Sequence, residues 1–114
     1  MNVTRLADAK PYEAKLHSEM LALRLQGLEA SELKSFSCSL SYFLPGGGAE
    51  WASSANEKVY VVIEGEVTII TEESGRRVDT RLGPLDSCLI GMNEGRAVEN
   101  RSNKIVTMLV IVSS

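Results

Sequence analysis

Histidine, cysteine and aromatic residues are scarce in this sequence. It holds one histidine, two cysteines and 5% aromatic residues among 114 residues. The cysteines, Cys38 and Cys88, lie in apolar stretches without a CxxC spacing, which is typical of buried, reduced thiols in a cytoplasmic protein. A disulfide between the two is the less favoured alternative. We therefore predict a cytoplasmic protein whose fold does not depend on disulfides.

The sequence also lacks a basic excess and long apolar runs. Its net charge is -3 and its pI is near 5.2, whereas nucleic-acid-binding domains carry clusters of lysine and arginine. The longest apolar runs, 59–63 and 106–112, are far shorter than the roughly 20 residues that span a membrane. Residues 1–5 lack the basic-then-apolar order of a secretory signal. We predict no nucleic-acid partner and no membrane partner.

What the sequence does contain is a series of short stretches with strand periodicity. From Met20 the leucines at 21, 23 and 25 alternate with Ala22, Arg24 and Gln26, which favours a strand, with a helix as the alternative. The residues at 36, 38, 40 and 42 are apolar, whereas serine occupies 37, 39 and 41. This alternation predicts a half-buried strand with its apolar face towards the core, ending at the glycines 46–48.

Further strands are predicted along the rest of the chain. Strands at 59–63 and 67–70 flank a tight turn at 64–66, and a hairpin tip at 74–76 precedes a strand at 78–82. Shorter strands follow at 87–90, 96–99 and 105–112. Many short strands with turns between them indicate an all-β sandwich or barrel. With 114 residues, 44% of them hydrophobic, we expect a single domain over residues 1–114.

The glycine turn and the strand after it resemble the first conserved motif of the cupin family. That motif is a glycine, then after five residues His-any-His, then after three a glutamate, and after six a glycine. Gly46 and Gly65 keep this spacing. The two histidine positions hold Ala52 and Ser54, and the glutamate position holds Lys58.

A second stretch resembles the family's downstream motif, Gly-x5-Pro-x-Gly-x2-His-x3-Asn. The matching positions here are Leu85, Gly91, Asn93, Arg96 and Asn100, of which only the last keeps the family's residue. The resemblance covers about residues 36–112 and implies a double-stranded β-helix, or jelly-roll barrel, with residues 1–18 as an N-terminal arm. It also implies a homodimer and a site in the barrel mouth.

The family's four metal-ligand positions correspond to Ala52, Ser54, Lys58 and Arg96. Alanine has no donor atom, serine is a weak neutral ligand, and protonated lysine and arginine cannot bind a metal. We therefore predict no metal and no cofactor. The single histidine, His17, could reach the barrel mouth, but we favour a structural role for it.

The replacements bring two cations, Lys58 and Arg96, to the place where relatives hold a metal ion. Three arrangements would compensate their repulsion. A carboxylate or phosphate of a small ligand could bridge them, or Glu50 or Glu99 could pair with them in a closed structural or regulatory barrel. Alternatively, Lys58 could be neutral and act as a base or an amine nucleophile.

We favour the binding of a small anionic metabolite in the barrel. The alternatives are a metal-independent isomerase, decarboxylase or lyase, in which Arg96 holds a substrate carboxylate and Lys58 moves a proton, and the closed barrel. Lys58 and Arg96 are the candidate catalytic residues. The candidate ligand-binding residues are Tyr42, Trp51, Ser54, Lys58, Tyr60, Met92 and Arg96. For the three aromatic residues among them we favour core packing over ligand binding.

Overall fold

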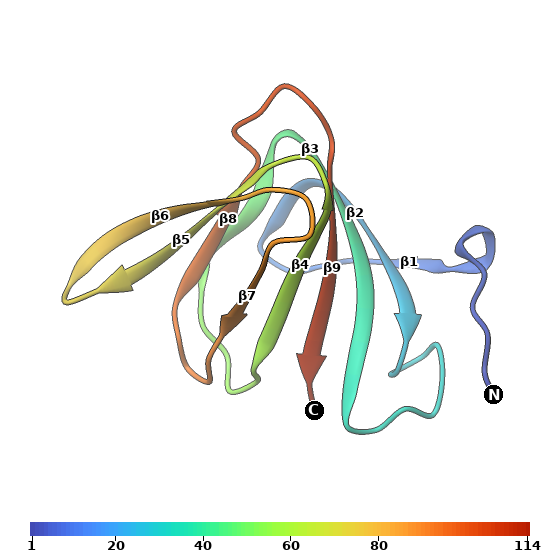
Figure 1. The fold of residues 1–114 in the computed structure, drawn as a ribbon. Coiled ribbons are helices and arrows are strands. Elements are labelled where there is room, and N and C mark those ends of the chain that lie inside the picture. Colours follow the sequence, from blue (N-terminus) through green and yellow to red (C-terminus); the bar gives the residue numbers. More distant parts are fainter.

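Nine strands and one short 3-10 helix make up the computed structural model, which describes residues 1–114 (Figure 1). Their bounds are η1 Leu6–Asp8, β1 Lys10–Tyr12, β2 His17–Gln26, β3 Phe36–Ala52, β4 Lys58–Glu64, β5 Val67–Glu73, β6 Arg76–Leu82, β7 Ser87–Ile90, β8 Arg96–Glu99 and β9 Val106–Ser113. The predicted all-β class is confirmed. None of its helical segments has the length and apolarity to cross a membrane.

Strand β3 belongs to both walls of the barrel. Its first half, Phe36 to Phe43, pairs with β2 and β9, and its second half, Gly48 to Ala52, pairs with β8 and with the start of β2. The chain bends between the halves at Gly46, whose φ of +83° favours glycine. The prediction that this strand ends at the glycines is therefore wrong, because they form a corner at which one strand passes between sheets.

The two predicted turns differ in what they join. The tip at Ser74 and Gly75 closes a true hairpin, in which Glu73 of β5 pairs with Arg76 of β6, and this hairpin projects from the barrel in Figure 1. The turn at Gly65 also exists, but β4 pairs with β7 and β9 whereas β5 pairs with β6 and β8. That turn carries the chain from one wall to the other.

The polarity of β3 is the reverse of the prediction. Its serines face the barrel interior, where Ser37, Ser39 and Ser41 are 7%, 2% and 5% exposed. The alternating apolar residues face outward, with Phe36 40% exposed and the side chains at 38, 40 and 42 half-buried. An apolar face turns outward here because the interior beside this half of β3 is partly a cavity rather than a solid core.

The packed core occupies the barrel around the second half of β3 and strands β4, β5, β8 and β9. It consists of Phe43, Ala49, Tyr60, Val62, Val67, Ile69, Leu82, Ile90, Val98, Val106 and Met108. Ahead of the barrel, β1 pairs with β2 through Lys10 and Arg24. Residues 10–12 are thereby held as an added edge strand beside the mouth of the barrel.

Candidate functional site

A cavity of about 250 Å³ lies inside the barrel, between the core and the mouth. It is lined by Tyr12, Ala14, His17, Arg24, Leu28, Ser37, Ser41, Phe43, Lys58, Tyr60, Arg96, Val98, Met108, Val110 and Val112. The lining contains cations, hydroxyl groups and apolar side chains, and it contains no aspartate or glutamate. A second depression, of about 360 Å³, lies between the N-terminus and β2, where Arg24 and Glu29 already form an ion pair.

Arg96 is the central cation of the cavity. Its side chain lies at the start of β8 and the residue is only 7% exposed. Its Nε donates to the hydroxyl of Tyr60 at 2.8 Å, and one terminal nitrogen donates to the main-chain oxygen of Glu50 at 3.1 Å. A guanidinium has five N–H groups, so three are left without an acceptor in the chain. No buried side-chain nitrogen or oxygen lacks a partner, so the free groups face space that solvent can reach.

Lys58 is the second cation that lines the cavity. Its ammonium group donates to the hydroxyl of Ser54 at 2.6 Å, and it forms no ion pair. Partial burial lowers the pKa of Lys58 below its ordinary value, and the positive charge of Arg96 lowers this pKa further. The cavity thus disfavours the protonated, positively charged form of Lys58, as expected where two like charges share a site.

The carboxylates predicted as possible partners do not pair with these cations. Glu50 is exposed and offers Arg96 only its main-chain oxygen, and the carboxylate of Glu99 pairs with Arg101 at 2.6 Å. The internal salt bridge expected for a closed structural barrel is therefore absent.

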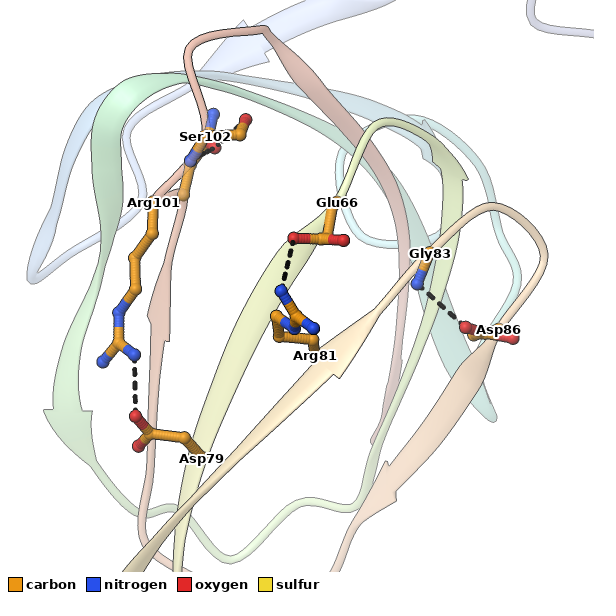
Figure 2. A network of polar contacts seen from close by, with 8 residues as sticks. Glu66, Asp79, Arg81, Gly83, Asp86, Arg101 and Ser102 are labelled. Carbon is orange, nitrogen blue, oxygen red and sulfur yellow. Dashed lines mark hydrogen bonds and ion pairs between the residues drawn. The ribbon is translucent and has the colours of Figure 1, made fainter.

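Two arginines on the outside of the barrel have carboxylate partners, in contrast to Arg96 and Lys58 inside it. Figure 2 shows Arg101 bonded to Asp79, at 2.7 Å, and Arg81 facing Glu66, at 3.8 Å. Both pairs are well exposed, and exposed pairs add little to stability. Arg24, which also lines the cavity, pairs with Glu29, so Arg96 and Lys58 are the cavity cations without a carboxylate partner.

His17, at the start of β2, also lines the cavity. Its Nδ1 contacts the main-chain oxygen of Lys15. Because a carbonyl only accepts, Nδ1 carries the hydrogen, and Nε2 of the neutral ring is an acceptor. Burial lowers the pKa of His17, the carbonyl contact raises it, and the charge of Arg96 lowers it further. The structure places His17 at the cavity and also gives it a hydrogen bond to the main chain, so it agrees with both interpretations of this histidine.

The structure brings together some of the predicted site residues and separates others. Lys58, Tyr60 and Arg96 line the cavity. Four residues predicted to bind ligand do not line it. Ser54 lies behind Lys58, whose ammonium group donates to its hydroxyl. Tyr42 lies on the outer face of β3 opposite Leu21, the ring of Trp51 stacks under Arg77 at 3.4 Å, and Met92 lies in a turn and is 65% exposed. Tyr42 faces outward because side chains alternate along β3 and the serines at 37, 39 and 41 take the inward face.

Sequence reasoning missed the part of the lining that comes from the N-terminal arm and from the serines of β3. Tyr12 reaches into the barrel, donates its hydroxyl hydrogen to Ser39 at 2.9 Å and carries the guanidinium of Arg24 over its ring at 3.8 Å. No short motif marks these residues. The run of alternating serines was visible, but its pattern is equally that of a solvent-facing edge.

The residues present do not fit a cupin metal centre. The positions that would hold the ligands are filled by Ala52, Ser54, Lys58 and Arg96, and no group of three or more histidine, cysteine, aspartate or glutamate side chains is placed to bind an ion. Two cations at such positions repel a metal ion. We derive no step through a metal.

Comparison with known proteins identifies the family. No family model matches the sequence. The protein named "Beta-D-galactosidase Rv1717" from Mycobacterium tuberculosis is 38% identical over 113 residues, which cover 99% of this chain and 94% of that protein. The structure of a cupin superfamily protein from Desulfitobacterium hafniense superimposes with a TM-score of 0.69 over 90% of this chain and 83% of that one, at 19% identity. This chain has the cupin fold.

This chain belongs to the same family as the mycobacterial protein. The polyketide cyclase RemF from Streptomyces resistomycificus shares the fold with a TM-score of 0.85 over 99% of this cupin and 79% of that chain, at 17% identity. At that identity the likeness concerns the jelly-roll barrel alone. The predicted jelly-roll fold is confirmed, and what the cavity of this cupin does must be argued from its own residues.

Proposed function

We propose that this cupin binds a small anionic metabolite, bearing a carboxylate or a phosphate, inside its barrel. One observation carries the proposal: the buried guanidinium of Arg96 has three N–H groups without an acceptor and no carboxylate partner. These N–H groups face space that solvent can reach, so water can take the place of an acceptor until an anion binds. An oxyanion that accepts bidentate hydrogen bonds from Arg96 and a further one from Lys58 would form charge-assisted hydrogen bonds there, which are roughly twice as strong as neutral ones.

The remaining lining supports the same proposal. Tyr60 accepts a hydrogen bond from Arg96, so its own hydroxyl hydrogen is free to be donated. Burial raises the pKa of Tyr60, although Arg96 acts against this rise, so the phenol stays a neutral donor. Arg96, Lys58 and Tyr60 can therefore all donate to an anion.

The test measures unfolding temperature in sodium sulfate, sodium phosphate and a panel of small carboxylates, against sodium chloride at matched ionic strength. A bound anion stabilises the native state by RT ln(1 + [L]/Kd), about 2.7 kcal/mol at a hundred times Kd. We expect stabilisation by at least one anion in the unmodified protein and its loss in Arg96→Gln and in Lys58→Gln. Arg101→Gln, which changes an exposed arginine outside the barrel, serves as the matched control and should keep the effect.

Two outcomes would refute the proposal. Equal stabilisation of Arg96→Gln and the unmodified protein would place the anion elsewhere. A complete lack of stabilisation across the panel would leave the cavity without the proposed ligand. Lys58→Gln, at a partly exposed position, keeps the test valid if Arg96→Gln does not fold.

A second candidate function is glycoside hydrolysis, favoured by the name of the mycobacterial relative. Most glycosidases use two carboxylates flanking the scissile bond, and the cavity of this cupin has none. Proton transfer would instead fall to His17, through Nε2, or to Lys58, whose lowered pKa suits a base. The same groups could serve the isomerase, decarboxylase or lyase chemistry considered above.

Hydrolysis of p-nitrophenyl β-D-galactopyranoside tests this candidate directly. Turnover in the unmodified protein that disappears in His17→Gln or Lys58→Met, with unfolding still cooperative, would support it. Turnover that survives both substitutions, or that disappears on further purification, would reject catalysis in this cavity.

We also propose that the protein is a homodimer, joined through the outward face of β2, β3, β9, β4 and β7. Two rows of apolar cross-strand neighbours cross this face: one holds Leu23, Leu40, Leu109 and Val61, and the other holds Cys38, Ile111, Val59 and Leu89. Five strands about 4.8 Å apart and about 20 Å of strand length give roughly 500 Å² per partner. Two such faces bury about 1,000 Å², which is the lower range of specific interfaces.

The dimer is tested by light scattering at tens of micromolar. We expect a dimer mass for the unmodified protein and a monomer mass for Leu89→Arg. Because Leu89 is exposed, the arginine places a charge on the proposed interface without disturbing the core. Leu85→Arg, at an exposed leucine in the turn before β7, is the matched control. A monomer mass for the unmodified protein would refute the proposal.

A further inference from the structure

The inner face of β3 carries hydroxyl groups that the fold does not use. Ser37 and Ser41 are 93% and 95% buried, since their exposed fractions are 7% and 5%, and both line the cavity. Neither hydroxyl takes part in a hydrogen bond of the chain, whereas Ser39 between them receives one from Tyr12. No buried side-chain oxygen lacks a partner, so these two hydroxyls open onto the cavity.

The strand register places these hydroxyls relative to the cations. Ser37 pairs with Val112 of β9, and Val112 pairs with Lys58 of β4. One row across three strands therefore begins with a hydroxyl, passes over an apolar side chain and ends with an ammonium group. Neighbouring strands lie about 4.8 Å apart, so the two ends of this row are about 10 Å apart between Cα atoms.

The next rows keep the same order. Ser39 pairs with Val110, which pairs with Tyr60, and Ser41 pairs with Met108. The inner face of β9 therefore forms an apolar strip of Met108, Val110 and Val112 between the hydroxyls of β3 and the polar groups of β4, with Arg96 of β8 lining the same cavity.

A ligand that satisfies all three zones has a defined chemistry. It carries an anionic group for Arg96 and Lys58, C–H groups that pack on the strip, and hydroxyls for Ser37 and Ser41. A pyranose ring has apolar C–H faces and a rim of hydroxyls. The cavity of about 250 Å³ lies below the roughly 300–1,000 Å³ of sites for drug-sized ligands, which suits a single ring.

We propose that the cavity is a site for a monosaccharide acid, with a carboxylate or phosphate on the sugar, in which Ser37 and Ser41 bind the hydroxyls. The inference rests on the proposed anion site at Arg96 and Lys58. It deepens that proposal by naming the ligand class and the residues that separate a sugar acid from other anions of the same size.

The test is calorimetric titration of the full chain with four probes. D-Galacturonate and D-galactose 6-phosphate carry both features, cyclohexanecarboxylate keeps the ring and the acid without hydroxyls, and D-galactose keeps the hydroxyls without the acid. We expect one of the two sugar acids to bind at least about tenfold more tightly than either single-feature probe, since each further hydrogen bond adds about fivefold.

Variants assign the effect to residues. Ser37→Ala and Ser41→Ala should each weaken the sugar acid about fivefold and leave the affinity for cyclohexanecarboxylate unchanged. Ser87→Ala, at an exposed serine of β7, should change neither affinity. Arg96→Gln should weaken both acids.

The possible results distinguish a failure of the sugar assignment from a failure of the anion site. Equal binding of cyclohexanecarboxylate and the sugar acids, insensitive to Ser37→Ala and Ser41→Ala but lost in Arg96→Gln, would overturn the sugar assignment and leave the anion site standing. Failure of every acid to bind, or binding of D-galactose as tight as that of its acids, would overturn the anion site and this inference together.

Discussion

Asn100 fixes the corner that joins β8 to β9, and its removal should destabilise the whole barrel. The residue is 1% exposed. Its side-chain nitrogen donates to the main-chain oxygens of Phe43, at 2.9 Å, and Lys104, at 2.8 Å. Its side-chain oxygen accepts from the amide and the hydroxyl of Ser102, at 3.0 and 2.7 Å. Asn100→Ala deletes four hydrogen bonds at once.

The loss of stability in Asn100→Ala depends on how well water can hydrogen-bond to the groups that Asn100 leaves without a partner. The oxygen of Phe43 is in the buried part of the site, so leaving it unsatisfied costs about 1–3 kcal/mol. The partners at Lys104 and Ser102 are only partly buried, so water restores part of their bonding and each loss costs near the lower limit of about 0.5 kcal/mol. The expected loss is about 2.5–4.5 kcal/mol, a large share of a typical domain's stability.

Asn100→Asp makes the same test without a change of shape. A carboxylate cannot donate to the two carbonyls and brings a buried charge with no cation beside it, so its folded-state pKa is raised. Stability from such a group is present at low pH and is lost as pH rises through the folded pKa. We therefore expect the Asp variant to be less stable at pH 7 than at pH 4.5, relative to the unmodified protein.

Urea unfolding followed by circular dichroism measures both variants. Asn103→Ala, at an exposed neighbour in the same corner, is the control and should lie within about 0.5 kcal/mol of the unmodified protein. An Asn100→Ala variant within 1 kcal/mol of the unmodified protein would show that the corner does not depend on these hydrogen bonds, and would refute the reasoning.

Three further predictions concern the glycine run and the cavity. Gly48→Ala should destabilise the barrel by more than about 3 kcal/mol, because an added Cβ would lie 2.0 Å from the main-chain oxygen of Val98. Gly46→Ala should cost only about 1 kcal/mol, because an added Cβ meets open space there and only the φ of +83° is unfavourable. Urea unfolding of the two variants compares these losses. The pKa of His17 is lowered in the folded state, so protonation of its ring opposes folding. The free energy of unfolding should therefore fall as pH drops below 6.5 towards the folded pKa, and His17→Gln should flatten this part of the profile. An unchanged profile in His17→Gln would contradict a buried His17. Sulfate affinity should fall as pH rises through the lowered pKa of Lys58, below 10.5, and Lys58→Arg should keep its affinity there; parallel titration curves for the two proteins would contradict a role for Lys58.

The sequence predicted the strands far better than their partners. Alternation and turn residues located β2 to β9 because these signals are local. The partner of a strand depends on contacts distant in sequence, so the turn at Gly65 had the signature of a hairpin although it joins two walls. The glycines at 46–48 were taken as an end because a corner within one strand uses the same residues as a turn.

The candidate site was predicted where the family spacing applied and missed where it did not. Lys58 and Arg96 occupy ligand positions of the motif, so their meeting followed from the fold. The serines of β3 have no such marker. Their alternation fixed two faces but not which was inside, because the inward face of a barrel with a cavity is as polar as a solvent-facing one.

Tyr12 and His17 line the cavity but lie outside the packed core. None of the residues in the packed core precedes Phe43, whereas both of these cavity residues come from the first 17 positions. Cleavage by a protease at the exposed residues near Lys15 would cut the covalent link between Tyr12 and the rest of the cavity wall, whereas His17 would stay on β2, paired with Ala49 of β3. The packed core lies after the cleavage point, so in the absence of ligand the nicked protein should melt as the intact one does.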